Sequence, residues 1–197
     1  MTTATTERAS ARERLLAAAN ELFYEHGVHT VGIDRVIERA GVAKATLYSA
    51  FGSKDGLIRA YLAARHEVRR AHITEQIARF DSPRERLLGV FDVLGESFAA
   101  SGFHGCAFVN ASAEASAESP ILEVTDQYRT WVRTLFTDLA RDAGAADPET
   151  LARQLVLLYD GAGISARMDH EPDAAGTART VAATLVDAAA IGAPVGR

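Results

Sequence analysis

The part of the sequence best suited to bind an anion is residues 40–57, AGVAKATLYSAFGSKDGL, which contains the only two lysines of the chain. Lys44 and Lys54 stand ten positions apart, and the hydroxyl groups of Thr46, Tyr48 and Ser49 lie between them. Ammonium and hydroxyl groups both donate hydrogen bonds to phosphate oxygens. On one surface these side chains could therefore bind a phosphate backbone, although a pair of surface lysines can also be simply solvated.

The elements around the lysines favour the first interpretation. A tight turn containing Gly41 joins two short predicted helices, at about 32–40 and 44–50, which is the arrangement of a helix-turn-helix. Lys44 then lies on the first turn of the recognition helix. Lys54 opens the next helix, where backbone N–H groups and an ammonium can hold a phosphate together. Spacing alone leaves open a helical protein with no role in DNA binding, because short helices joined by glycine are common in all-α proteins.

Local signals predict helices along the whole chain. SARE at 10–13 is typical of a capping box, and DSPRE at 81–85 indicates a second start in which Glu85 completes the box. Asp147-Pro148 predicts another start, apolar residues recur at helical spacing, and no segment alternates like a strand. We expect an all-α protein of about nine helices.

Composition narrows the class of protein. The 197 residues carry a net charge of −5, divided into +1 for residues 1–60 and −6 for the rest, so the less acidic part is N-terminal. No apolar run approaches the roughly 20 residues that span a membrane, and no signal peptide is indicated. A single cysteine fits a reducing cytoplasm. The histidines are scattered and no nucleophile, phosphate-loop or dinucleotide motif occurs, so we expect no metal, cofactor or catalytic site.

The stretch GIDRVIERAGVAKATLYSAFGSKDGL, residues 32–57, resembles the DNA-binding domain of the TetR family of bacterial transcriptional regulators. A-G-V, L-Y and F-x-S-K-x-x-L match in order and spacing, and the similarity is strongest over about residues 10–60. GCAFVNASAE at 105–114 also looks like a segment found in one branch of the family. The resemblance implies a helix-turn-helix domain at 1–55 and a helical ligand-binding and dimerisation domain at 56–197.

Carried onto this sequence, the resemblance implies DNA contacts from the recognition helix and a phosphate contact from the lysine after it. The implied residues are Lys44, Ala45, Thr46, Tyr48, Ser49 and Lys54. Ala43 stands where many members have Ser, so the recognition helix lacks a side-chain cap. Ala45 offers no hydrogen-bond donor but can pack against a thymine methyl group.

The resemblance also implies a small-molecule site in the C-terminal domain, and the aromatic residues of this domain predict a small, largely apolar molecule. The candidate wall residues are Phe91, Phe98, Cys106, Phe108, Tyr128, Trp131 and Met168. Any of them can instead be ordinary core. Tyr128 and Trp131 are the better candidates because each carries a polar atom that needs a partner when buried.

The last two predicted helices indicate a homodimer. Residues 151–166 are apolar around much of the helix, and residues 178–190 are rich in small residues that allow close approach. Both could pack inside one subunit, but a four-helix interface explains them better and is also implied by the resemblance. We therefore expect a dimeric repressor that a small molecule releases from a pseudo-palindromic operator. The alternatives are an activator, a thiol sensor using Cys106, and a helical enzyme or interaction module that does not bind DNA.

Overall fold

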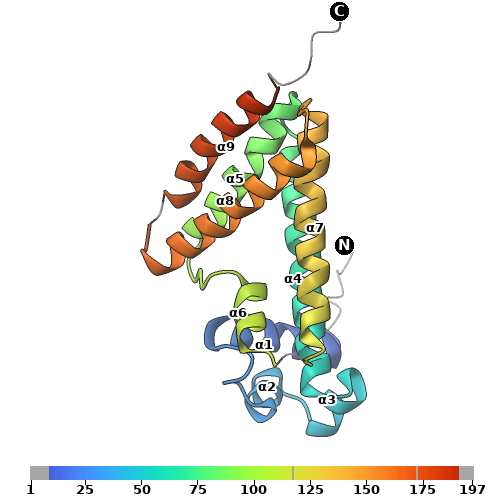
Figure 1. Cartoon of the computed structure of the whole chain (residues 1–197). Coiled ribbons are helices and arrows are strands. Elements are labelled where there is room, and N and C mark those ends of the chain that lie inside the picture. Colours follow the sequence, from blue (N-terminus) through green and yellow to red (C-terminus); the bar gives the residue numbers. More distant parts are fainter. Residues whose placement is uncertain (1–8, 117, 172, 191–197) are drawn as a thin grey trace, which may run out of the picture. The chain divides into compact units, whose positions relative to one another are not determined.

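The computed structural model describes residues 9–116, 118–171 and 173–190. These residues form nine α-helices and no strands, which confirms the all-α prediction. The helices, labelled in Figure 1, are α1 (Ala11–His26), α2 (Ile33–Ala40), α3 (Lys44–Phe51), α4 (Lys54–Ile77), α5 (Pro83–Ala99), α6 (Ala107–Glu114), α7 (Ile121–Asp142), α8 (Pro148–Met168) and α9 (Ala174–Ala190).

The helices pack into two compact units. The first unit contains residues 9–65 and 107–124, and the second contains 66–106 and 125–190. Helices α4 and α7 therefore contribute residues to both units. The functional boundary expected at residue 55 lies near the start of α4, inside the first unit.

In the first unit α1 packs against α2 and α3. The apolar face of α1 is buried, and it consists of Leu15, Ala19, Leu22 and Phe23. The ring of Phe23 meets the ring of Tyr61 edge to face, with centroids 5.7 Å apart. Val36 and Leu47 are fully buried as well, so α2 and α3 are each fixed to this core by an apolar side chain.

In the second unit α9 packs against both α5 and α8, and the three helices lie side by side (Figure 1). Phe91 and Leu155 contribute fully buried side chains from α5 and α8. Ion pairs between arginines and carboxylates also join α5 to α9: Arg84–Asp187 at 2.7 Å, Arg179–Glu85 at 2.9 Å and Arg179–Asp92 at 3.0 Å.

Helix starts follow the capping signals, with one exception. Ser10 and Glu13 make both bonds of a capping box, and the Asp147 side chain accepts from the Thr150 N–H at 3.0 Å. Ser82 accepts from the Glu85 N–H at 3.1 Å, but the reciprocal bond predicted for Glu85 is wrong. The Glu85 carboxylate instead accepts from two guanidinium groups, and charge-assisted bonds of this kind are stronger than a bond to a neutral backbone N–H.

Candidate functional site

Helix α3 presents a polar face to solvent. Lys44, Ala45, Tyr48 and Ser49 are exposed, and their spacing places them on one side of the helix. Tyr48 is 45% exposed, which is unusual for a large side chain with an apolar ring. Leu47 points the other way and is fully buried, so the orientation of the exposed face is fixed by the core.

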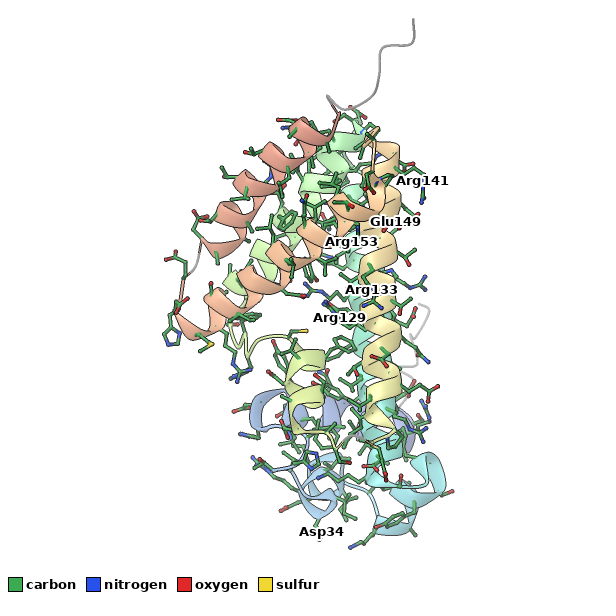
Figure 2. The ribbon with its side chains drawn as sticks, viewed as in Figure 1. Asp34, Arg129, Arg133, Arg141, Glu149 and Arg153 are labelled. Atoms are coloured by element: carbon green, nitrogen blue, oxygen red, sulfur yellow. The ribbon has the colours of Figure 1, made fainter. Side chains whose placement is uncertain are left out.

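The N-terminus of α3 is open. Ala43 occupies the cap position and makes no side-chain hydrogen bond to the first turn, as the sequence predicted. Free N–H groups and the helix dipole favour an anion at such an end. The Lys44 ammonium lies 3.1 Å from a carboxylate oxygen of Asp34, which is labelled at the lower edge of Figure 2. Both side chains are exposed, so this ion pair contributes little and can open when a phosphate approaches.

Lys54 begins α4 and contacts the turn after α1. Its ammonium donates to the backbone carbonyl of His29 at 3.3 Å. The Ser53 hydroxyl accepts from the Gly56 N–H at 3.0 Å, which caps the helix. The first turn of α4 therefore combines a cation with a helix N-terminus, a combination that suits a phosphate group.

Three contacts hold the short helices of this site in place. The Arg39 guanidinium pairs with the Glu21 carboxylate at 2.8 Å and joins α2 to α1. The Arg12 guanidinium lies over the Phe51 ring, 5.0 Å from its centroid, and joins α1 to α3. The Glu114 carboxylate, at the end of α6, accepts from the His29 N–H at 2.9 Å. Sequence patterns did not indicate the Glu114 contact, because 85 positions separate the two residues.

Among the ligand candidates, the structure brings Tyr128 and Trp131 together. Both lie on α7, with ring centroids 5.9 Å apart, and the His66 ring contacts both. Burial is the main cause that raises the pKa of Tyr128, so its hydroxyl remains protonated at neutral pH. Burial also lowers the pKa of His66, which favours the neutral imidazole.

The other candidates are spread over the molecule. Phe91 is fully buried against Phe136, and Phe98 contacts Phe103. Cys106 is half-buried, and Met168 is 73% exposed at the end of α8. Phe108 is buried on α6, in the first unit rather than the second.

Arginines contribute to the second unit in a way that the sequence did not indicate. The Arg69 guanidinium donates to the Tyr159 hydroxyl from Nε at 2.8 Å and from Nη2 at 2.6 Å. Arg129 points from α7 towards α8, as Figure 2 shows, and makes a two-bond ion pair with Asp160 at 2.7 and 2.8 Å.

The described part of the chain lacks both a cluster of metal ligands and a membrane-spanning helix. No cluster of three or more His, Cys, Asp or Glu side chains there could hold a metal ion. None of its helices combines the length and the apolar character needed to cross a membrane.

Comparison with known proteins identifies the family. Residues 15–61 match the model for bacterial regulatory proteins of the tetR family. A TetR-family regulator from Streptomyces coelicolor, SCO4454, is 32% identical with a TM-score of 0.86, and the alignment covers 91% of this chain and 96% of that one. A TetR transcriptional regulator from Streptomyces avermitilis, sav143, is 36% identical with a TM-score of 0.80, and the coverage is 92% and 98%.

Similarity to curated relatives is limited to a shorter stretch. The transcriptional activator FasR of Mycolicibacterium smegmatis is 49% identical over 43 residues, which is 22% of this chain and only 20% of FasR. The two Streptomyces structures, in contrast, match over nearly their full length at more than 30% identity. The chain therefore belongs to the TetR family and is a DNA-binding transcriptional regulator rather than an enzyme.

Proposed function

We propose that the protein represses transcription by binding a pseudo-palindromic operator as a homodimer, and that a small molecule bound in residues 56–197 releases it. The DNA-binding part is residues 1–55 together with the first turn of α4. Lys44, Ala45, Thr46, Tyr48 and Ser49 face the bases and nearby phosphates, and Lys54 binds a phosphate.

The observation that carries the DNA-binding part is the exposed face of α3. Four of its eight residues, Lys44, Ala45, Tyr48 and Ser49, are exposed on one side, while Leu47 anchors the opposite side. A recognition helix needs this division, because base edges are reached only by side chains that the core does not use.

Exposed apolar residues on α8 and α9 support the homodimer. Leu157, Ile164 and Met168 are 73%, 52% and 73% exposed. Ile164 and Met168 follow Leu157 by seven and eleven residues, which places all three along one stripe of α8. Val181 on α9 is 43% exposed. Apolar side chains exposed in a row mark a surface that a partner covers, and a second copy of the chain covers it in our proposal.

The central experiment is selection of bound sequences from a genomic library with the purified protein, followed by binding at several salt concentrations. We expect a two-fold symmetric site whose half-sites lie about one helical turn or a multiple of it apart. Affinity should fall steeply with salt for all DNA, and the selected site should bind at least about a thousandfold more tightly than random DNA. Equal binding to selected and random DNA would contradict sequence-specific recognition.

The direction of regulation needs a second assay. A reporter gene placed behind the selected site should be expressed less when the protein is present. FasR is a transcriptional activator, so an increase in expression would mean that this chain activates transcription as well. That result would overturn repression but leave the proposal of DNA binding intact.

A further inference from the structure

The second unit contains a partly buried arginine, Arg69, that pairs with no acidic side chain in the part of the chain that the structure describes. Among the described residues, no carboxylate forms an ion pair with Arg69, and its guanidinium donates its hydrogen bonds to one phenol oxygen, that of Tyr159. The charge of Arg129, in contrast, is compensated, because its guanidinium pairs with the Asp160 carboxylate through two bonds. A neutral phenol accepts hydrogen bonds but does not neutralise a positive charge.

The unpaired charge matters because arginine keeps it at every relevant pH. A guanidinium has five N–H donors, and Arg69 uses two of them in its bonds to the Tyr159 hydroxyl. Taking a cation out of water costs free energy unless an anion compensates for it. The three remaining N–H groups can still form the two parallel bonds with which arginine binds a carboxylate or a phosphate.

The neighbours of Arg69 extend this site with neutral donors and aromatic rings. The hydroxyls of Tyr159 and Tyr128 lie 3.3 Å apart, and because Tyr159 accepts from Arg69 its own proton can be donated to Tyr128. Tyr128 in turn contacts the rings of His66 and Trp131, and Phe136 lies against Tyr159. A cation next to a group of aromatic rings suits a ligand with one anionic end and one apolar end.

We infer that the effector of this protein is a small organic carboxylate with an apolar body, whose carboxylate pairs with Arg69 beside the Tyr159 and Tyr128 hydroxyls. This inference rests on the proposed function, because it names the chemical class of the molecule that releases DNA. The sequence alone predicts only a largely apolar effector, and the anionic end is added by the setting of Arg69.

Matched acid and amide pairs test the charge directly. The full-length protein is titrated with benzoate and benzamide, and with hexanoate and hexanamide, while the fluorescence of Trp131, the only tryptophan, is recorded. At least one acid should bind about tenfold or more tightly than its own amide, up to about 10 mM of either. If no acid binds in this range, or if acids and amides bind equally, the inference is overturned.

Variants then assign the preference to Arg69. Arg69→Gln should remove the preference for the acid and leave the amide affinity within about twofold, whereas Arg69→Lys should keep part of the preference. Arg70→Gln is the matched control, since Arg70 is exposed on the same helix and pairs with Glu67 at 2.7 Å. It should change neither affinity. Circular dichroism and thermal unfolding check that each variant is folded.

Operator release, measured separately, distinguishes the two proposals. If the acid binds through Arg69 but operator affinity stays the same, the anion site is correct and release by an effector fails. If neutral compounds release the operator equally from wild type and from Arg69→Gln, release by an effector is correct and the anion site is wrong.

Discussion

The two lysines of this protein occupy different chemical settings although both belong to the predicted DNA-binding surface. Lys44 forms an exposed ion pair with Asp34, a carboxylate that a phosphate can replace. Lys54 is held by a backbone carbonyl, that of His29, which has no charge of its own. The Lys54 ammonium therefore makes no ion pair among the described residues, and in our proposal it binds a phosphate rather than distinguishing bases.

Lys54→Ala should weaken binding to all DNA sequences by a similar factor. Because one phosphate contact is lost in each half-site, the slope of log affinity against log salt should decrease by about one per subunit. Arg70→Ala, which removes an exposed charge outside residues 1–55, is the control and should leave the slope unchanged. A change in base preference at constant slope would show that Lys54 does not act as a phosphate contact.

His66, whose ring contacts Tyr128 and Trp131, should make the stability of the protein depend on pH. Burial lowers its pKa below 6.5, so the unfolded chain binds more protons than the folded chain as the pH falls through this value. The free energy of unfolding should therefore decrease between pH 7.5 and pH 5, and His66→Asn should show less of this decrease. Urea unfolding at the two pH values measures it, with the exposed His170→Asn as control. An equal decrease in wild type and His66→Asn would exclude His66 as the cause.

Element boundaries were predictable where the signal lies within about four residues. The box at Ser10, the glycine at position 41 and Asp147-Pro148 each place a helix end, because a cap is satisfied by its own first or last turn. Glu85 was predicted wrongly because its carboxylate accepts from the neighbouring Arg84 and from Arg179, which lies 94 positions away. Contacts between distant residues leave no periodic trace in a sequence.

Part of the candidate site was likewise predictable from the sequence, and part of it was not. The face of α3 follows from helical spacing and from Leu47 as the buried anchor. The hydrogen bonds of Arg69 and Glu114 do not follow, because each joins residues that are 85 to 90 positions apart. Arginine is also abundant in this chain, so composition gives no reason to choose Arg69 over its neighbours.

Glu114, at the end of α6, holds the turn between α1 and α2 and lies close to Gly27 in that turn. This residue has φ +88° and ψ 151°, a region that is essentially limited to glycine, and a Cβ there would lie 2.9 Å from a carboxylate oxygen of Glu114. The same carboxylate accepts from the His29 N–H, and the His29 carbonyl accepts from Lys54. Displacing Glu114 should therefore disturb both the turn and the Lys54 ammonium.

Gly27→Ala should destabilise the protein by about 2–4 kcal/mol, from backbone strain together with the close contact to Glu114. Gly41→Ala is a partial control, because Gly41 lies in the less costly αL region at φ +63° and has no atom within 4 Å of its Cβ position. It should cost about 1 kcal/mol, from strain alone. Urea unfolding measures both, and adding Glu114→Ala to Gly27→Ala should recover part of the loss. If Glu114→Ala recovers none of the loss, the Glu114 contact does not contribute to the cost of Gly27→Ala.

At the scale of the whole molecule, two-fold symmetry would link the apolar stripe of α8 to operator affinity. A monomer presents one recognition helix and binds one half-site, whereas a dimer binds the second half-site at a high effective concentration. The residues that form the stripe therefore influence DNA binding although they contact no DNA in our proposal.

Leu157→Arg combined with Ile164→Arg should convert the proposed dimer into a folded monomer. Both side chains are mostly exposed in the single chain, so the substitutions leave its core intact, but in a dimer they would bury four arginines without partners. Sedimentation velocity at micromolar concentration should show half the wild-type mass, and operator affinity should fall by about a hundredfold or more. Val68→Arg is the control, because Val68 is 70% exposed on α4 and lies outside the stripe. It should remain dimeric and bind the operator normally. A double variant that stays dimeric would place the dimer interface elsewhere, and a monomeric variant with full operator affinity would show that recognition does not depend on two-fold symmetry.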